Sequence, residues 1–227
     1  MEELIQIRAA SKHNILTSLL LGGGGLIASA VIITWLPEPF YLFGIFLTSA
    51  SLVALLISWF KFREPPHSVE LDRSNIRYLH RHGQWQVAWE NIQRIDVPKV
   101  QKGLGQKELG MIGIKIKDYA PLLADISPRL MSNILMEQRP LLLHSTGLER
   151  VSDSSYGDSL LEDDRYKAED GNVLYGIQAM FANRMGKLRQ GLGYDLFISV
   201  AELDRSEQEF VTLLKQCQAQ VTQSRLN

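Results

Sequence analysis

The chain has 227 residues, a formal net charge of −1 and one cysteine, Cys217. A single cysteine excludes an intrachain disulfide, and the nearly neutral chain lacks the arginine–aromatic pattern of an RNA-binding sheet, so no nucleic-acid partner is expected. Residues 61–227 are numerous enough for one globular domain with its own core.

Two apolar runs, residues 15–36 and 40–60, contain no charged residue and are separated only by Pro37-Glu38-Pro39. As helices they would each be about 31–33 Å long, enough for a hydrocarbon core of about 30 Å. They predict a transmembrane helical hairpin. A cleaved signal peptide ending near Ala28-Ser29-Ala30 is the alternative, but the apolar run continues past that point and a second span follows.

The flanks of the spans predict the topology. Arg8 and Lys12 precede the first span, Lys61 and Arg63 follow the second, and the turn between them carries only Glu38. Because Lys and Arg favour the cytoplasmic side, both termini should be cytoplasmic. We expect a multi-pass membrane protein, with residues 1–14 as a cytoplasmic segment and 61–227 as a cytoplasmic domain.

Small residues recur at intervals of four in both spans. They favour close packing of the two spans on each other, with a homo-oligomer or a glycine-permitted kink as alternatives. Because neither span contains Asp, Glu, Lys, Arg or His, a proton relay, transporter or channel is disfavoured. The small residues are Ser18, Gly22, Gly24, Gly25, Ala28 and Ser29 in the first span, and Ala50, Ala54 and Ser58 in the second.

Period-two alternation after the spans predicts six strands, and a helical insertion of about residues 120–190 separates the fifth from the sixth. Within the insertion, Ser127-Pro128 should start one helix and Asn172 another, with Val173 and Leu174 on its buried face. Residues 149–170 are read as a flexible acidic loop. The expected strands lie at 68–72, 76–80, 84–89, 92–97, 111–117 and 194–200.

The last helix should begin at a capping box formed by Ser206 and Glu209. Its apolar residues keep helical spacing, which predicts a buried face containing Phe210, Leu213, Leu214, Cys217 and Val221.

The segments 75–78 (NIRY), 89–95 (WENIQRI) and 195–198 (DLFI), together with the two spans and the final helix, resemble membrane-anchored bacterial pleckstrin-homology-like (PH-like) proteins of an uncharacterised two-span family. The resemblance implies an α+β fold: an N-terminal transmembrane hairpin, then a PH-like antiparallel β domain with a helical insertion and a C-terminal helix. It implies a location in the bacterial inner membrane but no activity. The large insertion departs from that fold, and six strands stand where it has seven.

Basic residues in the early loops are candidates for holding anionic lipid head groups, as such residues do in PH-like folds. A solvated positive surface beside the membrane is the favoured alternative. The candidates are Arg73, Arg81, Lys99, Lys102 and Lys107.

No catalytic, cofactor-binding or metal-binding set is predicted. His80-x-His82 lies at an expected hairpin tip without further ligands, and Gly103-x-Gly105 lacks the context of a phosphate loop. The acidic residues 162–164 are read as solvated, and Cys217 as buried rather than nucleophilic. Arg184, Lys187 and Arg189 are expected to complement a helix dipole.

These observations favour a non-enzymatic scaffold that is held in the lipid bilayer and presents its domain to a protein partner. A sensor of anionic lipid head groups is the second hypothesis. An enzyme acting on a membrane-associated substrate is the third, and it would require polar groups that converge in a pocket of the insertion.

Overall fold

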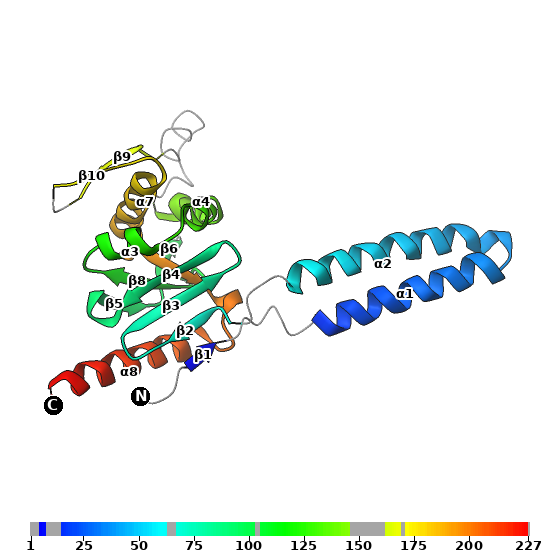
Figure 1. Cartoon of the computed structure of the whole chain (residues 1–227), viewed down its shortest axis with the longest axis horizontal. Helices are drawn as coiled ribbons and strands as arrows, with labels where there is room; N and C mark the ends of the chain where they lie inside the picture. Colours follow the sequence, from blue (N-terminus) through cyan, green and yellow to red (C-terminus); the bar gives the residue numbers. More distant parts are fainter. Residues whose placement is uncertain are drawn as a thin grey trace. The chain divides into compact units, whose positions relative to one another are not determined.

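The structure, a computed structural model, describes residues 5–7, 15–62, 67–102, 105–145, 162–168 and 171–226. The chain divides into two compact units, one of residues 9–66 and one that combines residues 1–8 with 67–227 (Figure 1). The first unit therefore interrupts the second in sequence.

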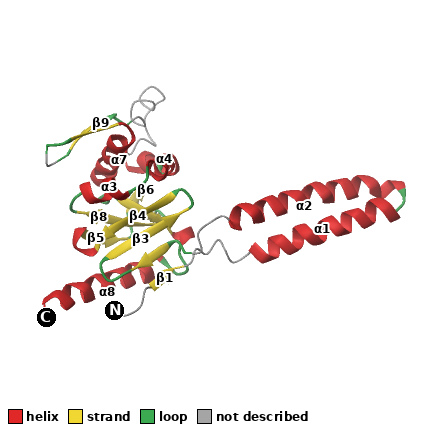
Figure 2. Cartoon of the chain, viewed as in Figure 1, coloured by secondary structure: helices red, strands yellow, loops and turns green. Residues whose placement is uncertain are grey.

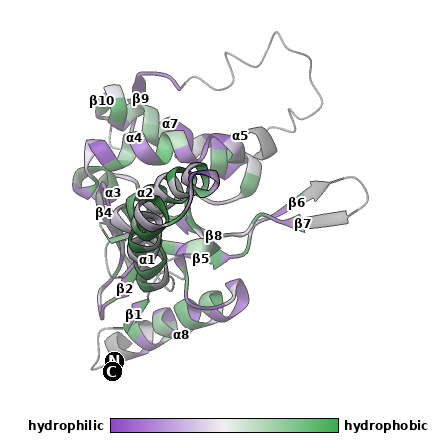
Figure 3. Ribbon diagram, turned by 90° about the vertical axis from the view of Figure 1, so that its right-hand side faces the viewer, coloured by the Kyte–Doolittle hydropathy of each residue, from purple (hydrophilic) through white to green (hydrophobic). Residues whose placement is uncertain are grey.

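The smaller unit is a helical hairpin of α1 (Ile15–Trp35) and α2 (Tyr41–Phe62), joined by the short 3-10 helix η2 (Glu38–Phe40). Both helices are long and apolar enough to cross a membrane, and only 11% of each apolar window is buried. In Figure 3, the residues of both helices are mostly apolar on all sides of each helix. The two apolar runs of the sequence thus form two long helices that leave most of their apolar surface uncovered.

Two of the four consecutive glycines of α1 account for its close approach to α2. A Cβ atom at Gly22 would lie 2.8 Å from Cγ of Leu55, and one at Gly25 would clash with Oγ of Ser51. At Gly23 and Gly24 a Cβ would meet nothing within 4 Å. The Thr48 hydroxyl also donates a hydrogen bond across the pair to Oγ of Ser29, at 3.0 Å.

The larger unit contains a four-stranded antiparallel sheet whose neighbours follow the order β1-β2-β3-β4. Its first strand precedes α1 in sequence and pairs with the strand that follows α2, so that Ile5 faces Leu71 and Ile7 faces Val69. The sequence interpretation did not include this strand. The strands are β1 (Ile5–Ile7), β2 (Val69–Leu71), β3 (Asn75–His80) and β4 (Gly83–Ala88).

A second, three-stranded antiparallel sheet has the order β11-β8-β5, and the 3-10 helix η3 (Trp89–Asn91) connects β4 to it. Its strands are β5 (Ile92–Asp96), β8 (Met111–Ile116) and β11 (Leu196–Ser199). Between β5 and β8 the chain forms the hairpin β6 (Lys99–Lys102) and β7 (Gly105–Glu108). The sequence predicted a basic loop there, which is wrong, because four residues of each arm pair in register.

The insertion between β8 and β11 contains both helices and a short β hairpin (Figure 2). Ser127 caps its second helix as predicted, accepting a hydrogen bond from the Leu130 N–H at 3.2 Å. The described elements are α3 (Ala120–Asp125), α4 (Pro128–Glu137), α5 (Arg139–Ser145), β9 (Arg165–Lys167), β10 (Val173–Tyr175) and α7 (Gly176–Leu192). Of the expected acidic loop 149–170, only residues 162–168 are described, and they include β9.

The helix that Asn172 was expected to cap begins three residues later, at Gly176, with Tyr175 as its N-cap residue. Val173 and Tyr175 belong to β10, where Val173 pairs with Lys167, and both side chains are exposed. Gly176 has a φ of +63°, a left-handed conformation that glycine adopts without strain and that reverses the chain between β10 and α7. Apolar spacing alone did not indicate this break.

The C-terminal helix α8 (Glu207–Leu226) follows the 3-10 helix η5 (Val200–Glu202). The predicted capping box is confirmed: the Ser206 N–H donates to Glu209 Oε2 at 3.0 Å, and the Glu209 N–H donates to Ser206 Oγ at 3.4 Å. In Figure 1, α8 lies on one side of the sheets, and α3, α4 and α7 lie on the other. The main core joins both sheets to these helices through buried residues such as Ile76, Trp85, Ile114, Phe181 and Phe210.

Candidate functional site

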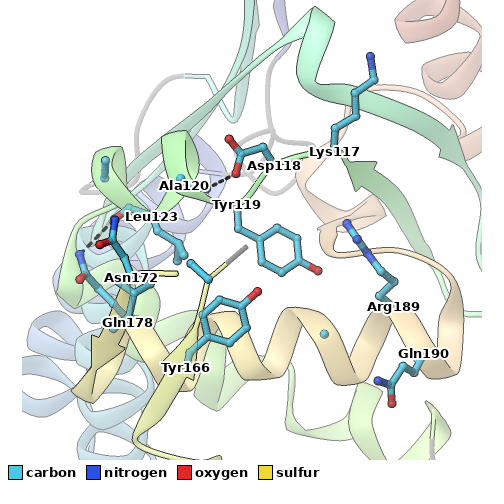
Figure 4. Close-up of a pocket in the computed structure, with 14 residues that line it drawn as sticks. Lys117, Asp118, Tyr119, Ala120, Leu123, Tyr166, Asn172, Gln178, Arg189 and Gln190 are labelled. Carbon is cyan, nitrogen blue, oxygen red and sulfur yellow. Dashed lines mark hydrogen bonds between the residues drawn. The ribbon is translucent and has the colours of Figure 1, made fainter. Parts of the chain in front are cut away.

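The insertion and the end of β8 enclose a cleft of about 620 Å³, called the first cleft below (Figure 4). That volume lies within the range of small-ligand sites. α3, the hairpin β9–β10 and α7 form its walls. The lining includes Lys117, Asp118, Tyr119, Leu123, Tyr166, Leu174, Gln178, Gly186, Arg189 and Gln190.

The chain directly after β8 is held in place by Asn91 and Asp118, which positions Tyr119. The Asn91 amide donates to the backbone oxygen of Asp118 and accepts from its N–H, both at 2.8 Å. Oδ1 of Asp118 in turn accepts the N–H of Ala120 at 2.9 Å, which starts α3 (Figure 4). The intervening Tyr119 ring lies beside the ring of Tyr166, with centroids 6.4 Å apart.

Behind Tyr119 lies the buried carboxylate of Asp195. It accepts hydrogen bonds from the Tyr119 hydroxyl at 2.7 Å and from the Ile116 N–H at 2.9 Å. It also accepts two from Arg189, Nε to Oδ1 at 2.6 Å and Nη2 to Oδ2 at 2.7 Å. Burial, followed by the hydrogen bond to Asp195, raises the pKa of Tyr119 well above its ordinary value. Tyr119 is therefore protonated at neutral pH and serves as a hydrogen-bond donor.

Arg189 connects this network to the first cleft. Its Nη2 also donates to the backbone oxygen of Ile116 at 2.6 Å, and its guanidinium lies 4.9 Å from the centroid of the Tyr119 ring. The side chain is 31% exposed, and within the described residues its Nη1 donates no hydrogen bond. The hydrogen bond to Asp195 raises the pKa of Arg189, so the guanidinium keeps its charge.

A buried ion pair holds the start of the β9–β10 hairpin on α7. Nε of Arg184 lies 2.5 Å from Oε1 of Glu162, and the two side chains are 3% and 2% exposed. Nη1 of Arg184 donates to the backbone oxygen of Leu135 at 3.1 Å. Nζ of Lys187 lies 3.0 Å from Oε2 of Glu162, an ion pair without the alignment of a hydrogen bond. The prediction that Glu162 is solvated is therefore wrong, because two cations of α7 attract it into the fold.

A second cleft has a volume of about 560 Å³ and is also lined by Tyr166. It shares Tyr166, Gly186 and Gln190 with the first cleft, and Asn183 and Lys187 also line it. The Asn183 amide fixes the adjacent chain by donating to the backbone oxygens of Asp163 and Arg165, both at 2.9 Å. The two clefts therefore adjoin along α7.

The sequence-predicted lipid-binding residues occupy different places. Arg73 lies in the β2–β3 turn and Arg81 in the β3–β4 turn, at opposite ends of a strand that spans about 20 Å. Lys99 starts β6 and pairs with Glu108 at 3.6 Å. Lys102 and Lys107 belong to β6 and β7, and their side chains lie outside the described part of the chain. The described members of this set do not converge on one site.

The other residues that the sequence analysis considered are the two histidines, the segment Gly103-x-Gly105 and Cys217. The rings of His80 and His82 lie 5.3 Å apart at the β3–β4 turn, and no cluster of three or more metal-ligating side chains occurs in the described ranges. Gly103 lies outside the described residues. Cys217 is buried as predicted, and burial raises the pKa of its thiol.

Sequence reasoning did not identify Tyr119, Tyr166 and Arg189 as site residues. Tyr119 and Tyr166 are 47 positions apart in the numbering, and only the packing of the insertion brings them together. One local signal was available: Gly186 stands inside the predicted helix, where glycine is unfavourable.

The fold and the clefts define an α+β protein with two helices that could span a membrane and a cleft-bearing insertion between two strands of its second sheet. Residues 69–220 match the model of DUF2982, a protein of unknown function, and the chain belongs to this family. No curated protein and no solved structure matches the chain.

Proposed function

We propose that this protein is a membrane-anchored binding module whose clefts receive a ligand on the side of the membrane where both chain flanks lie. The first cleft supports this proposal because it has the volume of a small-ligand site and apolar walls. It also exposes part of Arg189, whose guanidinium is held by the buried carboxylate of Asp195. The protein partner expected from the sequence stays a prediction. The volume of the first cleft favours a small ligand instead.

The strand arrangement supports a PH-like domain. A four-stranded and a three-stranded antiparallel sheet with a closing helix correspond to the seven strands and final helix that the sequence resemblance implies. Among these seven strands, the one that the sequence interpretation did not include is β1, which lies before the helical hairpin. On this proposal, the membrane anchor is inserted between the first two strands of the domain.

The pairing of β1 with β2 also supports the proposed topology. These strands directly flank α1 and α2 in sequence, and they exchange backbone hydrogen bonds within one unit. Two segments that pair in this way must lie on the same side of a bilayer. Together with the Lys and Arg residues of the flanks, this supports a cytoplasmic location of both termini in the bacterial inner membrane.

The chemistry of the first cleft supports binding rather than catalysis. Its polar groups do converge in the insertion, as the enzyme hypothesis required, but Tyr119 and Arg189 both donate their hydrogen bonds to Asp195. A tyrosine whose pKa is raised is a poor general base near neutral pH. These groups are suited to hold a ligand in a fixed orientation.

Native mass spectrometry of the full chain extracted from its membrane tests the proposal. Ala124→Trp would fill the first cleft from α3, while Arg129→Trp places the same side chain on an exposed position of α4. We expect a bound molecule in the wild type and in Arg129→Trp that is lost in Ala124→Trp. A bound molecule retained equally by all three proteins would remove the first cleft as the binding site.

A further inference from the structure

Gly186 lies in the interior of α7, at the point where the two clefts meet. Glycine is the least favourable residue after proline inside a helix, so a glycine there needs a reason. Gly113, in strand β8, is a glycine that packing within the chain does require, because a Cβ there would lie 2.5 Å from Cγ of Tyr194. At Gly186 a Cβ would meet nothing within 4 Å, so packing within the described chain does not require glycine.

The residues around Gly186 combine apolar walls with one oriented cation. Leu123, Leu174 and the rings of Tyr119 and Tyr166 provide flat apolar surface, and the two rings are tilted by 31°. Aromatic rings at such spacings readily accept a further ring against their faces or edges. Gly186 leaves room for such a group to contact the backbone of α7.

The cation is Arg189, one turn further along α7. Its Nε and Nη2 are occupied by Asp195 and Ile116, which fixes the guanidinium plane and leaves the two N–H bonds of Nη1 for a ligand. Arginine held in this way recognises carboxylates and other oxyanions through hydrogen bonds that the charge strengthens. Lys117 adds a second positive charge at the rim of the cleft.

Three of the acidic groups near the site are already engaged, and a fourth, Asp163, lines the second cleft with an exposed side chain. Asp195 is fully buried behind Arg189, so an entering ligand meets the guanidinium first. Asp118, the only acidic residue among the described residues that line the first cleft, accepts the N–H of Ala120. Glu162, in the second cleft, is paired with Arg184 and Lys187.

We propose that the two clefts form one site for a small soluble organic anion, whose planar apolar part lies over Gly186 beside Tyr166 and whose anionic group binds Nη1 of Arg189. This inference rests on the proposed binding function and assigns the chemical class of its ligand. The glycine is then explained by a contact with the ligand.

The probes are 1-naphthoate, a planar carboxylate, and 1-naphthamide, its neutral analogue. Binding is measured by isothermal titration calorimetry on the full chain in phosphatidylcholine nanodiscs, with empty nanodiscs as the blank. We expect saturable binding of 1-naphthoate that is at least about tenfold tighter than that of 1-naphthamide, because a charge-assisted hydrogen bond is lost with the amide.

Three variants locate the site. Gly186→Ala should raise Tm by a few degrees, because alanine favours the helix, and should still weaken 1-naphthoate several-fold. Lys117→Gln should weaken it a few-fold. Lys167→Gln removes the same charge from β9, where Lys167 is exposed and does not line either cleft, and should leave the affinity unchanged.

The outcomes separate this inference from the proposed function. Equal affinity for 1-naphthoate and 1-naphthamide, both weakened by Gly186→Ala, would overturn the proposal that the ligand is an anion. It would leave the position of the binding site in place. Affinity that Gly186→Ala does not change would overturn the position of the ligand. Displacement of 1-naphthoate by soluble dihexanoyl phosphatidylglycerol, but not by benzoate, would assign the site to a lipid head group and overturn the soluble ligand. The absence of saturable 1-naphthoate binding would overturn the inference, whereas the mass-spectrometric comparison decides the proposed function separately.

Discussion

The guanidinium of Arg189 and the carboxylate of Asp195 face each other as a bidentate pair, with N–O distances of 2.6 and 2.7 Å. Arg189 lies in the last turn of α7, and Asp195 lies just before β11. The pair therefore joins the end of the insertion to the second sheet, and Tyr119 joins the same carboxylate from the start of the insertion. One acidic side chain thus connects both ends of the 120–190 segment.

Asp195→Ala should destabilise the domain by about 3–5 kcal/mol, since removing one partner leaves the other charge and two further donors without an acceptor. The urea midpoint of the full chain in nanodiscs, followed by tryptophan fluorescence, measures the change. Asp163→Ala is the control, because that side chain is exposed and should alter the midpoint by no more than about 0.5 kcal/mol. A loss for Asp195→Ala as small as that of the control would show that the pair does not hold the insertion.

Alkaline pH should destabilise the fold through two tyrosines. Burial raises the pKa of Tyr78, whose hydroxyl donates to Oε1 of Glu202 at 2.7 Å, and it raises that of Tyr119. Above the unfolded pKa near 10 the unfolded chain loses these protons while the folded chain retains them, so stability falls as pH rises. Below that pH the two groups contribute no pH dependence.

Urea denaturation at several pH values between about 9 and about 11, one unit either side of the tyrosine pKa, measures this slope. Tyr78→Phe should make the decline above pH 10 (the approximate unfolded pKa) shallower and should cost about 1 kcal/mol at neutral pH through the lost hydrogen bond. An unchanged slope in Tyr78→Phe would assign the alkaline loss of stability to other groups.

Glu162→Gln should loosen the β9–β10 hairpin. The substitution leaves Arg184 buried without its anion. Removing such a partner completely lowers the free energy of unfolding by about 3–5 kcal/mol, and a neutral amide that still accepts a hydrogen bond should lower it somewhat less. Because Glu162 lies three residues before β9, the amides of β9 should exchange with solvent faster than those of β8, as hydrogen-exchange mass spectrometry would detect. The matched control is Asp163→Asn, and equal exchange in the two variants would contradict the role of the ion pair.

Much of the β structure could be predicted from alternation, because β3, β4, β5 and β8 are half-buried strands with neighbours close in sequence. The short strands β1, β9 and β10 could not, although β2, also of three residues, was predicted. β1 contains three residues, and its partner β2 lies beyond the whole helical hairpin, so no local pattern indicates the pairing. The same holds for β9 and β10, whose three-residue arms carry no repeat long enough to identify.

The candidate site was less predictable than the fold. Ser127, Ser206 and Glu209 act within one helical turn, so their capping roles follow from sequence. The partners of Arg189 and Arg184 are set by tertiary packing, and an arginine in a helical pattern gives no sign of whether a carboxylate will meet it. Clefts formed by an insertion depend on such pairs and cannot be located from periodicity.

Ile7→Ala tests whether the segment before α1 belongs to the domain. Ile7 is 0% exposed and packs in the main core, so its truncation should cost about 3 kcal/mol in the urea midpoint. Gln6→Ala, on the opposite and exposed face of β1, should change the midpoint by no more than about 0.5 kcal/mol. If both substitutions had the same small effect, β1 would not be part of the stable sheet in solution.

Gly25 and Gly24 offer a matched test of the helical hairpin, since they are neighbours on α1 with opposite surroundings. Gly25→Leu should separate α1 from α2, because its side chain would collide with Ser51, and overpacking of this kind costs about 1–3 kcal/mol. Gly24→Leu enters open space and should leave the thermal midpoint of the chain in nanodiscs almost unchanged. A larger loss for Gly24→Leu, together with reduced chemical crosslinking between chains, would contradict this prediction. That result would favour the homo-oligomer, because the face of α1 that carries Gly24 would then pack against a second copy.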